Sequence, residues 1–376
     1  MRSRCVPWAP AVLAALLVAC RHEPEQLRIG LLATFSGPYG DISGRPTRDG
    51  AHLAAAESGD IIIGGRRYRV RLVERDFADR ADAAAGAARS LINQDSVVAF
   101  IGPQFSRHAI PVAIVAEDAH ILMISPMSSN PAVTEDKRYV FRLAFLDDVQ
   151  ADVLARFARG DLESRRAAVL YDVTSAYSRG LAEQFRDGFA VGGRRVVAFE
   201  SYTADRANAI DPQMRRIAAA TPDVLFLPNF ADAVGHQIAA ARRAGLRVRL
   251  LGSDSWDPQS LPALGGLEAY VTSQWRPDLP LPAARRFVTR FSETYGGAPR
   301  SAAAMTYDAL GILLDAFRRA GSLDPDAVRA AIAATDGYQG ASGTVSFAGQ
   351  ADPRRDVAVS RVVDGSLHTV RLMVPE

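Results

Sequence analysis

Residues 97–124 read VVAFIGPQFSRHAIPVAIVAEDAHILMI. Two short apolar runs without polar alternation, 97–101 and 121–124, enclose an alanine-rich stretch over 107–119. Such runs are typical of strands buried on both faces of a sheet, and the stretch between them predicts a helix. This order of strand, helix and strand predicts two parallel strands joined by a helical crossover.

The same alternation continues on both sides of this unit. Further strands are expected at 27–33, 69–74, 167–171, 196–199, 224–227 and 249–251, and helices at 48–57, 81–93, 147–159, 178–191, 208–220 and 232–244. Three helices (283–295, 303–320 and 326–334) and three short strands (343–347, 357–363 and 367–374) follow. The pattern predicts an α/β fold of doubly wound parallel sheets with helices on both faces. A chain of 376 residues, 48% of them hydrophobic, has enough apolar material for two domains.

The charged residues exclude two classes of protein. Lys and Arg number 44 and Asp and Glu 42, a formal net charge of +2, so the chain lacks the broad basic footprint of a nucleic-acid-binding protein. Lys137 is the only lysine, and it follows Glu135-Asp136 rather than a glycine-rich loop. Because a P-loop needs a lysine directly after its glycines, nucleotide hydrolysis of that type is excluded.

Motifs for catalysis and metal binding are also absent from the sequence. It has no G-x-S-x-G, G-x-G-x-x-G or H-E-x-x-H pattern, and its six histidines show no metal-ligand spacing. His108 follows Ser106 by two positions, but residues i and i+2 do not face each other on a helix. The pairs Glu117-Asp118 and Asp147-Asp148 are interpreted as solvated helix charges. We therefore expect no enzyme, no cofactor and no metal.

The N-terminus has the layout of a secretory signal. Arg2 and Arg4 precede an apolar run over 6–19 that is too short to span a bilayer. The run ends in Leu17-Val18-Ala19-Cys20, which resembles a bacterial lipobox. We expect residues 1–19 to be a signal peptide, Cys20 to carry lipid and residues 20–26 to form a lipid-anchored linker. The alternative is a plain signal with an incidental cysteine.

Two consequences follow from that cleavage. Cys5, the only other cysteine, leaves with the signal, so the mature chain forms no disulfide. The rest of the sequence contains no apolar run long enough to span a bilayer. The expected location is the periplasmic, or extracytoplasmic, face of a membrane, held there by the anchor.

Ligand sites of open parallel sheets lie beyond the carboxyl ends of the strands. Ser106 and Ser129 follow the strands at 97–101 and 121–124, and Tyr177, Phe230 and Asp254 follow later strands. Hydroxyls near helix starts suit an anion, whereas a carboxylate in a closing cleft needs a cation opposite it. A small molecule that carries both charges is an amino acid, which is the expected ligand.

Each of these residues also has a structural interpretation. Helix capping alone would explain Ser106, and a role in a turn or cap would explain Asp254. Tyr177 and Phe230, taken singly, are more often core or rim aromatics.

The string Ile121-Leu122-Met123-Ile124-Ser125-Pro126 resembles a segment of the leucine/isoleucine/valine-binding proteins, the branched-chain amino-acid group of type I periplasmic binding proteins. Further strings resemble this family in the same order along the chain, and the resemblance covers essentially the whole mature sequence. They are Ser36-Gly37-Pro38, Asp49-Gly50-Ala51, Gly64-Gly65-Arg66, Val140-Phe141-Arg142, Asp148-Val149-Gln150, Ala176-Tyr177-Ser178-Arg179-Gly180 and Thr306-Tyr307-Asp308-Ala309.

The resemblance implies two lobes joined by three crossovers, with a ligand held between them by hinge closure. Lobe I would comprise 27–144 and 275–345, and lobe II 145–274 and 346–376. By position, Ser106 and Ser129 would hold the ligand carboxylate. Asp254 would face the ammonium with the carbonyl of Met127 and with Tyr177, and Phe230 would pack from lobe II.

The sequence departs from the family pattern in five places, two of which are Ala176-Tyr177-Ser178 and residues 57–60. Ser129 replaces a threonine and keeps the hydroxyl. Asp254 stands where the family has a glutamate, so its reach is one methylene shorter. The segment 39–43 aligns only with a gap, so the pocket for the ligand side chain stays undefined, and leucine-like, aromatic and amide ligands remain open.

The expected function is a substrate-binding lipoprotein of an ABC importer that captures a branched-chain or other neutral amino acid. Its partners would be the ligand, an ABC permease and the membrane through the lipid anchor, and a monomer is expected. One alternative keeps the fold but binds a non-amino-acid acid or amide, or senses a ligand for a receptor. A secreted enzyme is the third hypothesis.

Overall fold

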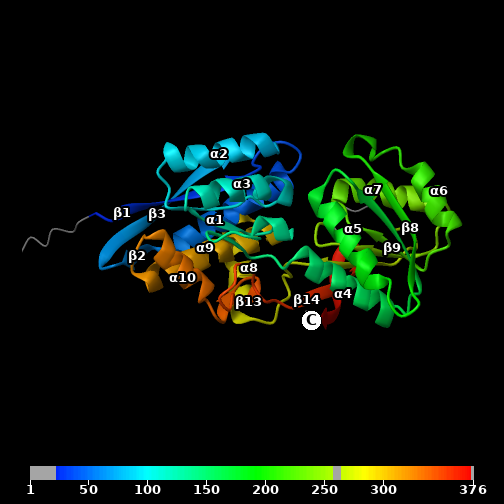
Figure 1. Cartoon of the computed structure of the whole chain (residues 1–376). Helices are drawn as coiled ribbons and strands as arrows, with labels where there is room; N and C mark the ends of the chain where they lie inside the picture. Colours follow the sequence, from blue (N-terminus) through cyan, green and yellow to red (C-terminus); the bar gives the residue numbers. More distant parts are fainter. Residues whose placement is uncertain (1–22, 257–263, 374–376) are drawn as a thin grey trace, which may run out of the picture.

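The computed structural model describes residues 23–256 and 264–373, and Figure 1 shows them as two α/β lobes side by side. Each lobe is built around one sheet. The expected signal peptide and Cys20 lie outside the described residues. Among the helices that are described, none combines the length and apolarity needed to cross a membrane.

The first lobe contains a six-stranded sheet in the order β2-β3-β1-β4-β5-β6. Neighbouring strands are parallel except β2, which pairs antiparallel with β3. The strands are β1 (Glu25–Ala33), β2 (Asp60–Ile63), β3 (Arg66–Asp76), β4 (Ala99–Ile101), β5 (Leu122–Ser125) and β6 (Val140–Arg142).

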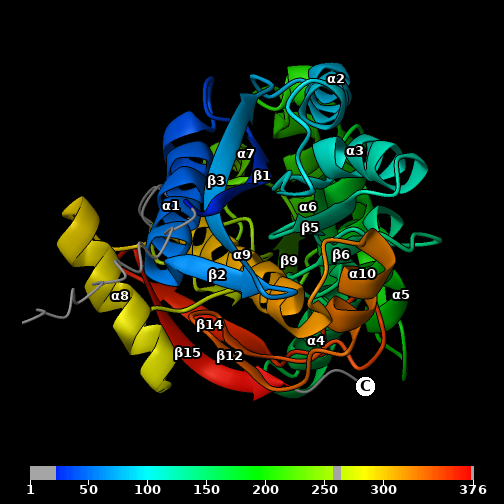
Figure 2. The same cartoon turned by 90° about the vertical axis from the view of Figure 1, so that its left-hand side faces the viewer.

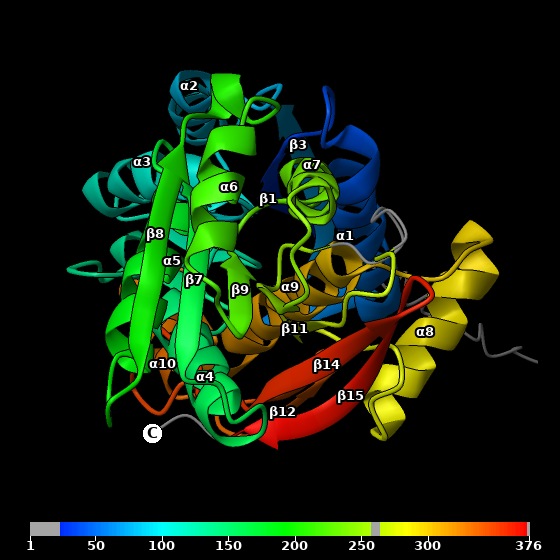
Figure 3. The ribbon, with the colours of Figure 1, turned by 90° about the vertical axis from the view of Figure 1, so that its right-hand side faces the viewer.

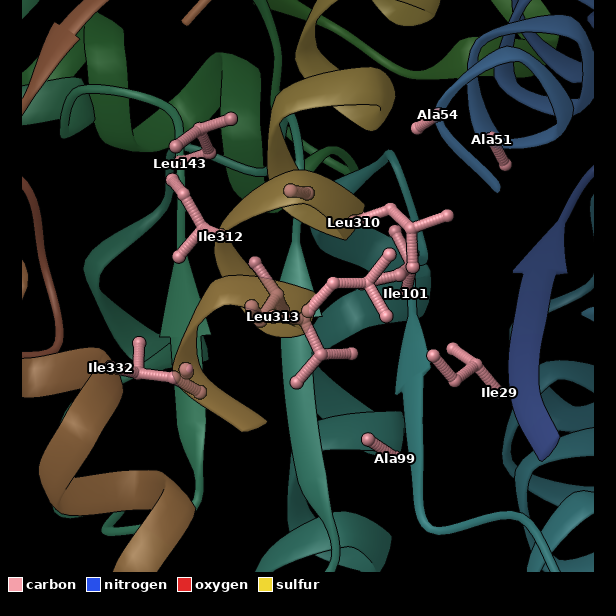
Figure 4. Close-up of a cluster of buried hydrophobic side chains, with 14 of the residues drawn as sticks. Ile29, Ala51, Ala54, Ala99, Ile101, Leu143, Leu310, Ile312, Leu313 and Ile332 are labelled. Carbon is pink, nitrogen blue, oxygen red and sulfur yellow. The ribbon is translucent and has the colours of Figure 1, made fainter. Parts of the chain in front are cut away.

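Helices cover both faces of this sheet because its strands are apolar on both sides. Ile29 and Ile101 pack with Leu310 and Leu313 on one face (Figure 4), whereas Leu32 belongs to the core on the other. Figure 2 views this lobe end-on, with α1 on one side of β1 and β3 and with α2 and α3 on the other. The helices are α1 (Arg45–Ser58), α2 (Ala81–Asn93), α3 (Ser106–Asp118), α8 (Pro282–Tyr295), α9 (Ser301–Ala320) and α10 (Pro325–Ala333).

The second lobe contains a seven-stranded sheet in the order β15-β14-β11-β10-β9-β7-β8. Its strands from β8 to β11 are parallel, and β14 and β15 join antiparallel at the far edge (Figure 3). The strands are β7 (Arg166–Asp172), β8 (Arg195–Tyr202), β9 (Val224–Leu227), β10 (Arg249–Gly252), β11 (Ala269–Ser273), β14 (Val357–Val363) and β15 (Ser366–Met373).

The helices of the second lobe divide between the two faces of its sheet. The cores on these faces contain Phe226 and Leu227, neighbours on β9 that point in opposite directions. Helices α4 (Asp147–Gly160) and α5 (Ala176–Phe189) cover one face, and α6 (Asp211–Ala219) and α7 (Ala231–Arg243) cover the other.

The chain passes between the lobes where buried residues change core. Leu143 packs in the core of the first lobe and Phe145 in that of the second. Trp275, directly after β11, and Phe347 pack in the first core, and Val357 packs in the second. The domain boundaries at 144/145, 274/275 and 345/346 stay predictions, because core membership does not locate a hinge.

The predicted fold class is confirmed, and the parallel strands and helices expected from the sequence are present. Four strands were not expected: β2, β6, β11 and the short β12 (Tyr338–Gly340), which pairs with β13 (Gly343–Val345). Each spans three to five residues. The C-terminal strands extend the second sheet antiparallel, a correction to the expectation of parallel strands alone.

Candidate functional site

A cavity of about 590 Å³ is lined by residues from both lobes. Six of the lining residues are those singled out from the sequence: Ser106, Met127, Ser129, Tyr177, Phe230 and Asp254. The first three belong to loops or helix starts of the first lobe and the other three to the second. The loops beyond the carboxyl ends of the strands therefore meet at one site. The ligand contacts assigned to these residues stay predictions.

Ser106 reaches the cavity because the loop after β4 turns sharply. At Gly102 φ is +103°, and a Cβ there would lie 2.0 Å from the carbonyl oxygen of Leu32, so only glycine fits. Helix α3 then begins at Ser106, and its N-cap is Phe105, whose side chain makes no cap hydrogen bond. Ser106 Oγ instead accepts a 3.4 Å hydrogen bond from the amide of Asn130, so the capping interpretation is wrong.

The start of α3 is suited to an anion. The first hydrogen bond within the helix region runs from the amide of His108 to the carbonyl of Phe105 at 3.0 Å. The amides of Ser106 and Arg107 precede that bond and carry the positive end of the helix dipole. A carboxylate placed here would meet these amides and the Ser106 hydroxyl together.

The loop after β5 is held against the loop after β4. Ser125 Oγ and Ser128 Oγ donate to the carbonyl of Pro103 at 2.7 and 3.3 Å. Ser129 is 1% exposed, and its carbonyl accepts a 2.8 Å hydrogen bond from the amide of Asp147. These bonds fix the Ser106 and Ser129 segments relative to each other.

Arg142 holds the loop after β5 in place through hydrogen bonds to its carbonyl groups. Its side chain is fully buried, pairs with Asp352 and donates to the carbonyls of Ser128, Asn130 and Pro131 at 3.1, 2.9 and 3.2 Å. Sequence reasoning missed this role, although Arg142 ends a short strand and was part of a family string. A lone arginine after a strand gives no signal for which carbonyls it will bind.

In the second lobe, Asp254 lies in the loop after β10, where the Trp256 ring packs closely against Gly252. A Cβ on Gly252 would lie 2.3 Å from the ring of Trp256, so glycine lets the tryptophan fold back against the end of β10. Trp256 Nε1 donates to the carbonyl of Leu227 at 3.0 Å. The loop therefore holds Asp254 at the edge of the cavity.

Both carboxylate oxygens of Asp254 already accept hydrogen bonds. The Tyr177 hydroxyl donates to Oδ1 at 2.5 Å, and Gln274 Nε2 donates to Oδ2 at 2.7 Å. Burial raises the pKa of Asp254, and these two hydrogen bonds oppose that rise. Each oxygen keeps a further lone pair, so the carboxylate remains able to accept from an ammonium.

Asp147 lies behind this site, and its interpretation as a solvated helix charge is wrong. It is 1% exposed because the first turn of α4 is covered where the chain enters the second lobe. Gln150 Nε2 donates to Asp147 Oδ1 at 2.9 Å, and the amide of Asp254 donates to Gln150 Oε1 at 3.3 Å. Burial, chiefly, and the nearby charge of Asp254 raise the pKa of Asp147 to about 8.

An aromatic layer closes one side of the cavity across the two lobes. The ring centroid of Phe230 lies 5.5 Å from that of Phe105 and 6.0 Å from that of Tyr39. The Tyr39 hydroxyl donates to Asp232 Oδ2 at 3.4 Å, and Arg107 lies over all three rings. Desolvation, reinforced by the charge of Asp232, raises the pKa of Tyr39 to about 12.

Several lining residues were not found from the sequence. Segment 39–43, which the alignment left out, leads into a π-helical turn (Gly40–Gly44), and Tyr39, Ile42 and Ser43 line the cavity. Ser273 is the last residue of β11 and Trp275 lies two positions beyond it; because this strand was not expected, neither residue was predicted to line the cavity. Gln104 was in the quoted loop but was not singled out.

The structure bears on metal binding and on the histidine that follows Ser106. Within 23–256 and 264–373 no group of three or more His, Cys, Asp or Glu side chains is placed to hold a metal ion. His108 is buried, packs against Phe77, and hydrogen-bonds through Nε2 to the carbonyl of Asp79 at 3.1 Å. Burial lowers the pKa of His108 to about 4.

Comparison with known proteins identifies a family and close structural likenesses. The model of the family described as "Periplasmic binding protein" matches residues 26–366. A leucine-specific-binding protein of Salmonella typhimurium is 26% identical over 263 residues, 68% of each chain, and an amino acid binding protein of Pseudomonas aeruginosa is 28% identical over 310 residues, 81% of each. The crystal structure of a leucine binding protein, LivK, from Thermotoga maritima has a TM-score of 0.85 at 29% identity, over 93% of this chain and 99% of the other.

Proposed function

The chain belongs to the periplasmic binding proteins, as a type I member of the leucine/isoleucine/valine-binding group, and from this premise we propose that it captures one amino acid between its lobes. The relatives are named for leucine or for amino acids, which supports a ligand of that class.

The observation that carries the proposal is that groups suited to an anion and a carboxylate suited to a cation line one cavity from different lobes. The hydroxyls of Ser106 and Ser129 and the first amides of α3 line it from the first lobe, and the Asp254 carboxylate lines it from the second. An α-amino acid carries its carboxylate and its ammonium on the same α-carbon, so one small molecule can contact both lobes. In this arrangement the ligand stabilises the closed form because each lobe contacts one end of it.

Calorimetry of the purified protein against the twenty amino acids tests this proposal. At least one is expected to bind with a Kd in the micromolar range or below. If none binds at millimolar concentration, the amino-acid assignment fails.

We further propose that the protein delivers its ligand to an ABC permease while anchored through Cys20. The family assignment supports the delivery, and the lipobox-like string supports the anchor. Expression of the full chain in a bacterium fed radioactive palmitate should label it, and Cys20→Ala should abolish the label and release the protein from membranes. Label that persists in Cys20→Ala would contradict the anchor.

A second candidate keeps the fold and replaces the ligand. Both oxygens of Asp254 already accept hydrogen bonds from the protein, so the carboxyl has partners without a ligand ammonium, and a ligand that lacks one, an acid or an amide, is the alternative. Comparison of an amino acid with its deaminated analogue separates the two, because only an ammonium-binding site loses affinity for the analogue. For the role, adjacent permease and ATPase genes would favour transport, and an adjacent sensor kinase would favour ligand sensing.

A further inference from the structure

Gln104 is a polar residue in the wall of the cavity that neither proposed charge contact uses. It lies two positions before Ser106 in the loop after β4, lines the cavity and is 4% exposed. The same wall also contains the apolar side chains of Ile42 and Trp275. An amide in this position is unusual unless its hydrogen bonds are satisfied.

Only one end of the Gln104 amide is satisfied by the protein. Nε2 donates to Thr47 Oγ1 at 2.5 Å and to Thr306 Oγ1 at 3.2 Å, on α1 and α9. Oε1 is shielded from solvent and has no hydrogen-bond partner in the part of the chain that the structure describes.

Rotating the amide by 180° would not change this result. The hydroxyls of Thr47 and Thr306 both donate and accept, so they would donate to Oε1 in the reversed orientation and leave Nε2 without a partner. In either orientation one polar atom of Gln104 is unpaired. Such an atom costs about 1–3 kcal/mol when it is buried against hydrocarbon.

A second unpaired group lies in the same wall. Ser273, at the end of β11, lines the cavity, and its hydroxyl is buried without a hydrogen-bond partner among the described residues. Gln104 and Ser273 come from different lobes and different elements, so they are independent observations. A ligand with a hydrocarbon side chain would leave both groups unpaired, whereas a hydroxyl or amide on the ligand could pair with them.

We propose that Gln104 determines specificity, and that the ligand is a neutral amino acid with a hydrogen-bonding side chain, a hydroxyl or a carboxamide, in preference to leucine, isoleucine or valine. This inference rests on the proposed function and names the substrate class of the same site. Because Gln104 lines the cavity, its unpaired amide atom is the group that we assign to this contact. Sites built to hydrogen-bond a ligand discriminate strongly against isosteres that lack the polar group.

Two pairs of amino acids of nearly equal shape test the inference on the unmodified protein. Threonine and valine differ by a hydroxyl against a methyl, and asparagine and leucine by a carboxamide against an isopropyl end. In calorimetry, at least one polar member should bind about 10- to 100-fold more tightly than its apolar counterpart. If leucine and valine bind more tightly than asparagine and threonine, the inference is wrong and the proposed function stands. If no amino acid binds, the proposed function itself fails.

Gln104→Leu then assigns the preference to this side chain. The variant should lose most of the polar-over-apolar ratio, and its affinity for leucine should rise. Gln213→Leu is the matched control, because Gln213 on α6 also has a buried, unpaired Oε1 but does not line the cavity. A ratio that is unchanged in Gln104→Leu, or lowered equally in Gln213→Leu, would overturn the role of Gln104.

Discussion

The Tyr177 hydroxyl donates a 2.5 Å hydrogen bond to Oδ1 of Asp254, and the two residues follow the ends of different strands of the second sheet. Tyr177 lies in the first turn of α5, after β7, and Asp254 follows β10. The bond orients the carboxylate and leaves it able to accept from a ligand. Gln274, which follows β11, holds the other oxygen. The proposed ammonium contact is therefore built from three separate strand ends.

Asp254→Ala should weaken amino-acid binding by more than ~2 kcal/mol, about 30-fold, because it leaves the ligand ammonium unpaired. Calorimetry with the tightest amino acid measures the change. Asp211→Ala, which removes a carboxylate paired with Arg243 on the surface of α6, serves as the control and should bind normally. Wild-type affinity in Asp254→Ala would refute the ammonium role.

Tyr177→Phe should weaken binding by about 1 kcal/mol, because it removes one hydrogen bond and keeps the ring. The lost bond is one that lowers the pKa of Asp254, so that pKa should rise. A carboxyl with a higher pKa is ionised only at higher pH, so affinity should begin to fall at a higher pH on acidification than in wild type.

The control for that experiment is Tyr139→Phe. Tyr139 also donates its hydroxyl to a carboxylate, that of Asp326 at 3.0 Å, but does not line the cavity. Its pH profile of binding should match the wild type. Identical profiles for all three proteins would mean that Tyr177 does not tune Asp254.

Asp147 should make stability fall with rising pH. Its pKa is about 8 in the folded protein against an ordinary value of 3.8, so the folded state holds a proton that the unfolded chain releases. The free energy of unfolding should therefore fall as pH rises from about 4 to about 8 and level off above that. Asp147→Asn, which keeps the acceptor for Gln150 Nε2, should remove this dependence.

Urea unfolding at pH 5 and pH 8 measures that effect. Between these values wild type should lose more than about 1 kcal/mol relative to Asp147→Asn. Asp148→Asn, the adjacent position on α4, controls for the loss of a negative charge and should follow the wild type. A parallel pH dependence in wild type and Asp147→Asn would contradict the buried-proton account.

Arg142→Met should cost about 3–5 kcal/mol of stability, because Asp352 and the carbonyls of Ser128, Asn130 and Pro131 lose a buried partner. Chemical denaturation measures this loss. Arg138→Met removes an arginine whose side chain is 65% exposed and should change stability by less than about 1 kcal/mol. Equal losses in the two variants would mean that burial of Arg142 carries no special weight.

Much of the candidate site could be predicted because parallel strands bring their carboxyl ends to one edge. Ser106 and Asp254 lie beyond strands whose apolar runs are visible in the sequence, and both line the cavity. Ser273 and Trp275 could not be found in that way, because β11, which brings them to the cavity, was itself not expected from the sequence. The burial of Asp147 was missed for a related reason: an acidic pair at a helix start has the same local pattern whether water or protein covers it.

Local periodicity in the amino-acid order determined the α/β class, the helices and the loops that follow the main strands, since it depends on residues a few positions apart. Only tertiary structure decided which of those loops face each other. It also decided the pairing of Tyr177 with Asp254 and the unpaired amide of Gln104. These features depend on groups brought together from distant segments, whose separation in space no local pattern encodes. Burial then sets the cost of each unpaired group, and with it the preference of the cavity for a ligand.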